Sequence, residues 1–257
     1  MDAVLEPVTS HAHALDLSGG DPWVRWNIPV QPSWRMWRSE HALAVERMGR
    51  RHSLTIIPLP AASDPDEAVA ELATQASGDG IIAEYGIAGL SVPQASLGAV
   101  QSVLDLHPGG DWDWMWTTTT PVSIPGADRV VELDDVADAE EIAALSAHHS
   151  PTSEGEPGTG VSERWVGVRD LGGDLIAAGA MQRLGSGIPH LAGIVVHSDH
   201  RGTGLGLAVT AGLTEIGLAD SGVCTLGMYS DNGAARRTYE RCGYATAWAW
   251  ASRRLHP

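Results

Sequence analysis

The sequence predicts an α/β (α+β) protein of two domains, in which strands and helices are mixed. Three observations predict this class. The chain has 257 residues, which exceeds one typical domain. The run Thr117–Gly126 is rich in Thr, Ser and Pro, which breaks any regular periodicity. Strand-like and helix-like segments alternate on both sides of this run. We therefore expect a smaller α/β domain over residues 1–125 and a second domain over residues 126–257.

The N-terminal half contains one clear helix start. Asp64 can cap the helix, Pro65 fits its first position, and Glu67 can complete a capping box. Short apolar runs on either side predict the remaining elements. The expected elements are strands at 41–44 and 53–59, a helix at 64–76, a short strand at 80–85 and a helix at 93–106.

The N-terminal half also holds seven of the ten tryptophans, at positions 23, 26, 34, 37, 112, 114 and 116. So large an apolar area is expected to be mostly buried. The cluster Asp111–Trp116 alternates acids and aromatics, as a strand with one hydrated face and one packed face would. We favour packing for this cluster, and a wall that binds a cationic amine is the alternative.

The C-terminal half shows a longer and more regular series of elements. Two strands are joined by Asp170-Leu-Gly-Gly-Asp174, whose glycines allow a tight hairpin, so these strands should pair antiparallel. Apolar residues at helical spacing, Leu205, Val209, Leu213 and Ile216, predict a helix that packs on a sheet. The expected elements are strands at 128–133, 165–169, 175–184, 190–196, 223–229 and 244–250, with helices at 137–149, from 205 onward, and at 234–241.

The composition excludes several classes of function. All sixteen basic residues are arginines, so a Walker A loop, a protein kinase site and Schiff-base chemistry, which need lysine, are excluded. The formal charge of −16 disfavours nucleic acid as a partner and favours cationic substrates such as amines. An acidic surface that serves solubility alone is the commoner explanation of such a charge.

The sequence also predicts the cellular setting. Cys224 and Cys242 lie in apolar or helical patterns, which indicates two reduced core residues rather than a disulfide or metal framework. No stretch is apolar enough to span a membrane, and residues 1–20 lack the features of a secretion signal. We expect a cytoplasmic protein that binds neither a membrane nor a metal.

The strongest functional signal is the segment Val196-His-Ser-Asp-His-Arg-Gly-Thr-Gly-Leu-Gly206, which leads from a strand into a long helix. Glycines let backbone N–H groups turn toward a ligand, and the helix N-terminus favours negative charge. The segment can therefore bind an anion such as a pyrophosphate. Its G-x-G-x-G spacing does not match the dinucleotide fingerprint G-x-G-x-x-G. A tight turn without a ligand is the alternative.

A second motif, Asn232-Gly-Ala-Ala-Arg-Arg-Thr-Tyr239, follows the next predicted strand. Asn232 can cap a helix, and Tyr239 lies close to two turns further on, so both can face the same edge of the sheet. The two motifs, in this order of elements over residues 128–254, resemble the GNAT superfamily of acyl-CoA-dependent N-acetyltransferases. Ser198 stands where the family usually has proline, and His200 where an aromatic residue is common.

The resemblance implies a fold and a co-substrate. It implies a GNAT-like mixed, mostly antiparallel sheet with splayed central strands and flanking helices. It also implies acetyl-CoA as co-substrate without a metal. The hairpin, helix and strand order of the N-terminal half weakly echoes the same fold, so this half is open to interpretation as a degenerate copy in a tandem GNAT protein.

The resemblance also implies roles for individual residues. Backbone groups of Ile194, Val195 and Val196 would pair with the pantetheine arm as an added strand does. Asn232 would hydrogen-bond the pantetheine, and Tyr239 would protonate the departing thiolate while a neutral amine attacks the thioester. A backbone N–H on the splayed strand would stabilise the oxyanion. The amides that would hold the pyrophosphate belong to Arg201, Gly202, Thr203, Gly204, Leu205 and Gly206.

The general base is open at this stage. His190, at the start of the strand at 190–196, is the first candidate because histidine titrates near neutral pH. His148 and His149, at the end of the helix at 137–149, are the next, and a water chain is the alternative.

We therefore expect a transferase that passes an acetyl group from acetyl-CoA to the amine of a small molecule by direct attack. The N-terminal domain would shape the acceptor site, in a monomer or homodimer with one coenzyme A per chain. Two alternatives remain: a non-catalytic acyl-CoA-binding or sensing module, and an enzyme that acetylates a protein or peptide. Tyr239 favours an enzyme over a sensor.

Overall fold

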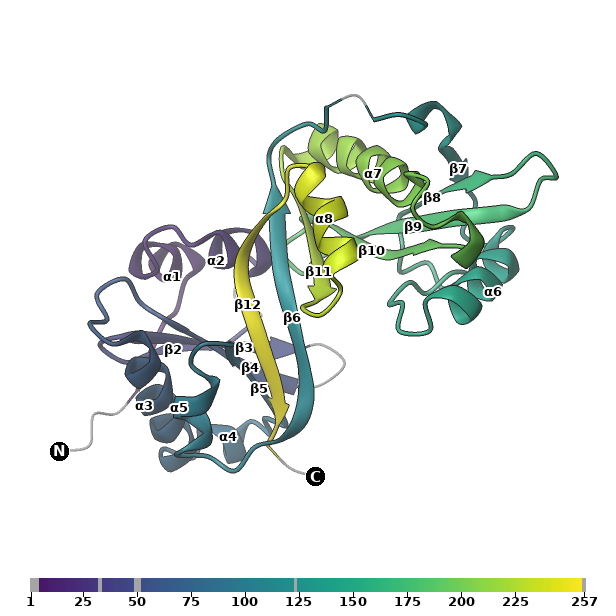
Figure 1. Cartoon of the computed structure of the whole chain (residues 1–257). Helices are drawn as coiled ribbons and strands as arrows, with labels where there is room; N and C mark the ends of the chain where they lie inside the picture. The colour runs from purple at the N-terminus through teal and green to yellow at the C-terminus, as the bar shows by residue number, and fades with distance from the viewer. Residues whose placement is uncertain (1–4, 32–33, 49–51, 123, 256–257) are drawn as a thin grey trace. The chain divides into compact units, whose positions relative to one another are not determined.

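The computed structural model describes residues 5–31, 34–48, 52–122 and 124–255, and the chain divides into two compact units. Unit 1 comprises Met1–Trp114, Tyr229–Asp231 and Ala247–Pro257, and unit 2 comprises Met115–Met228 and Asn232–Thr246. Each unit is a mixed sheet with helices against it (Figure 1). The predicted α/β class, mostly antiparallel with flanking helices, is confirmed.

The sheet of unit 1 has the strand order β1-β2-β3-β4-β5-β12, with β6 next to β12. Strands β4 and β5 run parallel. The pairs β1–β2, β2–β3, β3–β4 and β5–β12 are antiparallel. The strands are β1 (Glu6–Pro7), β2 (Met36–Arg38), β3 (Ala42–Met48), β4 (His52–Pro58), β5 (Gly89–Pro93), β6 (His107–Thr117) and β12 (Ala245–Arg254). The helices are α1 (His11–Leu17), α2 (Pro22–Asn27), α3 (Pro65–Gly78), α4 (Ile81–Glu84) and α5 (Leu97–Gln101).

Helix α3 begins where the sequence predicts. The carboxylate of Asp64 accepts hydrogen bonds from the backbone N–H groups of Asp66 and Glu67, both at 3.1 Å, and Pro65 occupies the first position. One face of α3 packs on the sheet and builds the core of unit 1. Buried members of this core include Leu54, Ile56, Val69, Leu72, Ala73, Leu90 and Val92.

Two predictions in unit 1 are wrong. Residues 80–85 form the short helix α4 rather than a strand, because Gly80 takes the left-handed conformation that starts a new turn. Only Leu97–Gln101 of the predicted helix at 93–106 is helical, and Pro93 ends strand β5 instead. Both segments are short apolar runs, in which periodicity does not distinguish a strand from a helix.

The tryptophans of the N-terminal half are buried or half-buried, as expected. Trp23 and Trp114 are fully buried, and Trp23 stacks edge-on against Trp250 of β12 at 5.3 Å between ring centroids. The predicted hydrated face of residues 111–116 is wrong at Asp113, which is only 1% exposed and accepts a hydrogen bond from the Ser230 hydroxyl at 2.7 Å. Packing therefore covers both faces of β6 at this point.

The sheet of unit 2 has the strand order β6-β11-β10-β9-β8-β7, to which β6 contributes its last residues. β10 and β11 run parallel, whereas β7 to β10 pair antiparallel, including the predicted hairpin β8–β9. The strands are β7 (Val131–Leu133), β8 (Arg164–Arg169), β9 (Leu175–Arg183), β10 (Pro189–Val196) and β11 (Cys224–Tyr229). The helices are η1 (Ala127–Arg129), α6 (Ala139–His149), η2 (Ser198–His200), α7 (Leu205–Ser221) and α8 (Gly233–Arg241).

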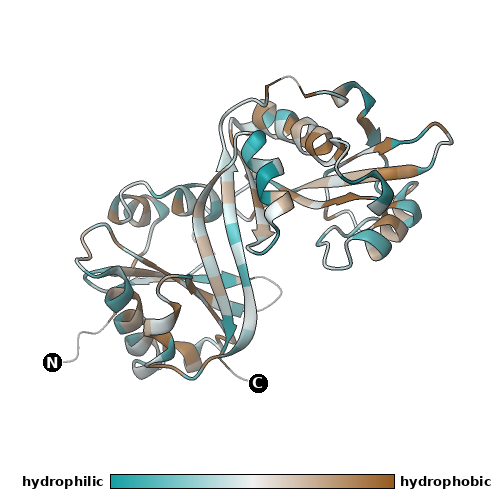
Figure 2. Ribbon diagram, viewed as in Figure 1, coloured by the Kyte–Doolittle hydropathy of each residue, from teal (hydrophilic) through white to brown (hydrophobic). Residues whose placement is uncertain are grey.

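Helix α7 packs on the sheet of unit 2 through its apolar face. A Cβ added at Gly179 of β9 would lie 2.7 Å from Val209 and 3.0 Å from Leu213, so this glycine lets the helix approach the strand. Ile216 is 38% exposed and lies outside the packed face that the sequence assigned to it. Figure 2 shows α7 as largely hydrophobic and α8 as mostly hydrophilic.

The two units do not coincide with residues 1–125 and 126–257. Residues 247–257 belong to unit 1, because β12 pairs with β5 from Trp250 opposite Pro93 to Arg254 opposite Gly89. Residues 115–125 belong to unit 2, since the end of β6 borders β11. In the described part of the chain, no helix has the length and apolar character that a membrane crossing requires.

Candidate active site

Strands β10 and β11 separate soon after they begin to pair. Their parallel register comprises His190 opposite Thr225 and Leu191 opposite Leu226, and no later residues of the two strands are paired in the described chain. β10 is also irregular against β9 between Ala192 and Val195. Its last residues, Ile194 to Val196, thus run beside a gap in the sheet, where their backbone groups can pair with an extended ligand.

Gly193 makes the irregularity of β10 possible. Its φ is +63°, which side-chain-bearing residues rarely adopt, and an added Cβ would lie 3.0 Å from Gly155. The indole of Trp165 packs against both glycines, and its Nε1 donates to Asp135 at 2.8 Å. Sequence reasoning missed the contact among Gly155, Gly193 and Trp165. The only signal in the sequence was a lone glycine within a predicted strand.

The segment Arg201–Gly206 forms an open cradle at the start of α7. Gly202 and Gly204 have φ of +75° and +89°, and a Cβ added to either would meet nothing within 4 Å. No side chain caps the first turn of α7 at Gly204, so the first backbone N–H groups of the helix lack the usual internal partner. These donors and the open space above the glycines suit a pyrophosphate.

The loop before the cradle is braced by local hydrogen bonds. The Thr203 hydroxyl donates to the His200 carbonyl at 2.6 Å, and a Cβ added at Gly206 would contact Val196 at 3.4 Å. The Arg201 guanidinium donates to the His149 carbonyl at 2.6 Å, and the Arg201 backbone N–H donates to the Ser198 carbonyl at 3.3 Å. Both groups of Arg201 therefore support the loop, and within the described chain the backbone N–H groups that face no such partner begin at Gly202.

Asn232 is the N-cap of α8, and Tyr239 lies in the last turn of the same helix. The Asn232 side-chain oxygen accepts from the Ala235 N–H at 3.0 Å and caps the helix, which leaves its amide N–H₂ as a donor. Tyr239 is buried, and burial raises the pKa of its hydroxyl to about 12. Among the described residues, no hydrogen bond is made by this hydroxyl, whereas the neighbouring Tyr244 hydroxyl bonds Thr214 at 3.0 Å.

His190 is hydrogen-bonded at the start of β10. Its Nδ1 lies 2.9 Å from the Thr225 hydroxyl, whose single hydrogen is donated to the Pro189 carbonyl at 2.9 Å. Thr225 must therefore accept from His190, so Nδ1 carries a hydrogen. This contact lies at the point where β10 and β11 are still paired.

The other two histidine candidates make different contacts. His148 is exposed, and its Nδ1 donates to the Ala144 carbonyl at 2.8 Å within α6. His149 accepts the N–H of Ser198 at 3.2 Å, and its ring centroid lies 4.0 Å from that of His197. His149 thus contacts the loop before the cradle.

The two cysteines are buried and unpaired, as the sequence predicts. Burial raises the pKa of Cys224 to about 11 and that of Cys242 to about 12, so both thiols stay protonated and unreactive. Across the described ranges, no three His, Cys, Asp or Glu side chains converge as metal ligands would.

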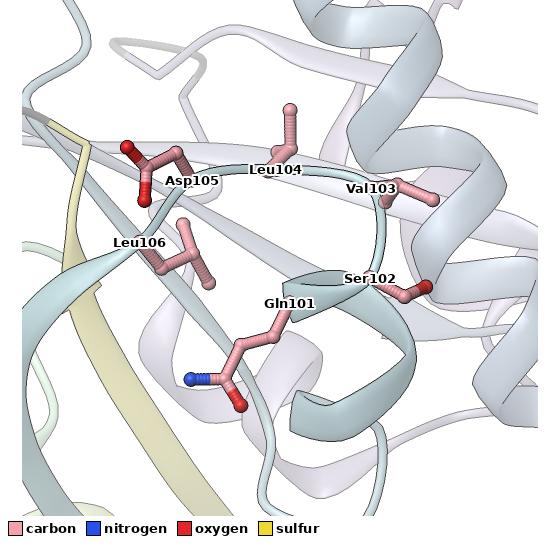
Figure 3. A pocket seen from close by; sticks show the side chains of 6 residues that line it. All are labelled: Gln101, Ser102, Val103, Leu104, Asp105 and Leu106. Carbon is pink, nitrogen blue, oxygen red and sulfur yellow. The ribbon is translucent and has the colours of Figure 1, made fainter.

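A separate pocket of about 460 Å³ lies in unit 1 (Figure 3). It is lined by Gln101–Leu106, the segment that follows α5. None of the residues that the sequence predicts as functional lines it.

Comparison with known proteins agrees with the geometry of unit 2. Residues 134–244 match the model of the Acetyltransferase (GNAT) family. No curated protein matches the chain. The matched range 134–244 includes the cradle, Asn232 and Tyr239.

Solved structures share the fold at low sequence identity. A structural-genomics protein from Drosophila has a TM-score of 0.59 at 14% identity, with 99% of both chains covered. A GCN5-related N-acetyltransferase from Sphaerobacter thermophilus has a TM-score of 0.57 at 13% identity, with 99% of this chain and 96% of that one covered. An acetyltransferase of the GNAT family from Novosphingobium aromaticivorans has a TM-score of 0.52 at 20% identity, covering 80% and 88%.

Proposed function

Because residues 134–244 form a domain of the GNAT acetyltransferase family, we propose that the protein transfers the acetyl group of acetyl-CoA to the amine of a small molecule. The observation that carries the proposal is the open cradle Arg201–Gly206 beside the splayed end of β10. Acetyl-CoA supplies a thioester, and the chain supplies its binding, its orientation and the proton transfers.

The co-substrate would be held along β10 and at the start of α7. Backbone N–H and C=O groups of Ile194, Val195 and Val196 pair with the amides of the pantetheine arm. The side-chain amide of Asn232 donates to the same arm. The pyrophosphate is held by backbone amides of the cradle after Arg201, whose own N–H bonds Ser198; they are those of Gly202, Thr203, Gly204, Leu205 and Gly206.

Tyr239 is the proposed general acid. Its raised pKa means that the hydroxyl keeps its proton throughout the neutral range. A hydroxyl without a protein partner can turn toward the thiolate that departs when the amine attacks. Tyr244 cannot take this role while its hydroxyl is bonded to Thr214.

His190 is the proposed base for the amine. The amine must lose a proton to attack, and an imidazole at the start of β10 is a side chain of the right type to accept it. The net charge of −16 attracts cationic amines toward the protein, which supports an amine as the acceptor.

The test compares two glycines that share a left-handed conformation. Gly204→Val fills the cradle, whereas Gly173→Val fills open space in the β8–β9 hairpin, where Gly173 has a φ of +96°. Both variants carry similar backbone strain. We expect calorimetry to show a loss of acetyl-CoA affinity of at least about tenfold for Gly204→Val alone, from the loss of several backbone hydrogen bonds.

Turnover is then measured as thiol release from acetyl-CoA with a panel of small amines and with amine-bearing peptides. Thiol release that depends on a small amine supports the enzyme. Tight acetyl-CoA binding without release for any amine would favour a sensing module, and release with peptides alone would favour a protein acetyltransferase. Equal acetyl-CoA affinity in both folded glycine variants would refute the assignment of the cradle as the pyrophosphate site.

A further inference from the structure

The loop that leads into the cradle is tied to the end of α6. The backbone N–H of Ser198 donates to Nδ1 of His149 at 3.2 Å, and the Arg201 guanidinium donates to the carbonyl of the same residue at 2.6 Å. His149 and Ser198 are far apart in sequence, so these are tertiary contacts between α6 and the loop at 197–201. The loop position therefore depends on a single residue at the end of α6.

A second histidine supports the next amide of the loop. The N–H of Asp199 donates to Nδ1 of His197 at 3.2 Å. The ring centroids of His149 and His197 are 4.0 Å apart. An Nδ1 that accepts a backbone hydrogen carries no hydrogen of its own, so His149 makes its contact with the ring hydrogen on Nε2. Two successive amides of the loop are thus held by two adjacent histidines.

The surroundings of His149 oppose its protonation. Burial lowers the pKa of His149 most, and the neighbouring positive groups His197, His148 and Arg201 lower it further, against a smaller opposite effect of Asp199. His200 lies beyond His197, with 5.5 Å between their ring centroids. A protonated His149 would carry hydrogens on both nitrogens, so it could no longer accept the Ser198 N–H.

We infer that His149 is a positioning residue that holds the cradle loop only while it is neutral, so that acidification weakens binding of a phosphate-bearing co-substrate. The inference rests on the proposed function, because acetyl-CoA is the ligand of the cradle. It adds a residue that touches no ligand and acts through the backbone of Ser198. It also assigns His149 to the loop rather than to the amine proton.

The sign of the effect follows from the direction of the shift. The ordinary pKa of histidine is 6.5, and that of His149 is lower in the folded chain. The contact is therefore fully present above pH 6.5 and is lost as the pH falls through the lowered pKa. Extra positive charge on the histidines would have the opposite effect and attract phosphate, so the two readings predict opposite trends.

The experiment measures acetyl-CoA affinity by calorimetry in the full chain, from about pH 7.5 downward in steps to about pH 4.5, because the pKa of His149 lies below the ordinary value. His149→Asn places a side-chain oxygen near the position of Nδ1, so it can accept the Ser198 N–H but cannot titrate. His148→Asn is the matched control, because the hydrogen bond that the described structure gives His148 lies within its own helix and not on the loop at 197–201. Removing the charge of His148 raises the pKa of His149, so this variant should lose affinity at a slightly higher pH than the wild type. Circular dichroism at each pH verifies that each variant is folded.

We expect acidification to weaken acetyl-CoA binding by the wild type and by His148→Asn about three- to tenfold more than it weakens binding by His149→Asn. The loss of one backbone hydrogen bond implies a change of this size. Titration of the acetyl-CoA phosphates is common to all three proteins and cancels in the comparison. The same pH dependence in His149→Asn and the wild type would refute the inference. An affinity that rises on acidification only when His149 is present would also refute it.

Imidazole ¹⁵N shifts provide a readout that does not need the ligand. At neutral pH we expect His149 with its hydrogen on Nε2, and an Nδ1–H form would refute the inference. If the wild type binds no acetyl-CoA at any pH, the proposed function fails. The tautomer of His149 then tests the contact between His149 and Ser198 without the ligand.

Discussion

At the scale of single residues, two tyrosines of unit 2 differ in the partners of their hydroxyls, since that of Tyr244 interacts with Thr214 and Cys224. The Tyr244 hydroxyl donates to Thr214, which in turn donates to the Thr210 carbonyl, whereas the Tyr239 hydroxyl has no partner among the described residues. The two ring centroids are 6.2 Å apart. Both side chains are buried, and burial raises the pKa of both hydroxyls. This pair provides a matched test of general acid catalysis.

Tyr239→Phe removes the proposed proton donor and keeps the ring. We expect kcat to fall by about 10²- to 10⁴-fold, while the dissociation constant of acetyl-CoA stays unchanged. Tyr244→Phe should keep kcat near the wild-type value and lower the free energy of unfolding by about 1 kcal/mol, since Thr214 loses its donor. Steady-state kinetics and urea unfolding measure both, and a kcat for Tyr239→Phe within twofold of wild type would reassign Tyr239 to packing.

At the scale of elements, a buried carboxylate joins the first strands of unit 1. Glu46 of β3 is 1% exposed and accepts from the backbone and side chain of Arg35 and from His52 of β4. Burial alone would raise the pKa of Glu46, but the hydrogen bonds of Arg35 and His52 and the charge of Arg35 outweigh it and lower the pKa. A lowered carboxylate pKa stabilises the folded state above the ordinary value of 4.5, and this contribution is lost as the pH falls.

Glu46→Gln keeps the shape of the side chain and removes its charge. We expect it to lower the free energy of unfolding by about 1–3 kcal/mol near pH 7. The loss should be smaller near pH 4, because below the ordinary pKa of 4.5 the unfolded wild type binds a proton that the folded state binds less well. Glu132→Gln is the control, because its partner Arg164 and the carboxylate are both exposed and such pairs contribute little. Urea unfolding of both variants at the two pH values tests this, and an equal loss at each pH would contradict a charged Glu46.

At the scale of the whole molecule, the cradle and the Asn232–Tyr239 pair occur in unit 2 alone. In the described part of unit 1, Gly19 and Gly20 precede α2, but the Asp21 carboxylate already caps the first N–H groups of that helix. Helix α3 begins with the acids Asp66 and Glu67, which repel a phosphate. We therefore expect one acetyl-CoA per chain in a calorimetric titration. A stoichiometry of two would show that unit 1 also binds the co-substrate.

The sequence determined the local elements and the two motifs because their signals are short-range. The cap at Asp64, the glycine turn between β8 and β9 and the helix after Gly204 each depend on residues within a few positions. It could not distinguish strand from helix at 80–85, where a short apolar run allows both. Nor could it show that Asp113 is buried, since the Ser230 hydroxyl that bonds it lies 117 residues away.

Tertiary structure alone decided which distant segments meet. It paired β12 with β5, and so assigned the last strand to the unit formed mainly by the first half of the chain. It also brought His149 to Ser198 and set the tautomer of His190 through Thr225, which no spacing in the sequence indicates. The physical reason is that strand pairing and side-chain hydrogen bonds depend on distance in space, whereas caps, glycine turns and hydrophobic periodicity depend on distance along the chain.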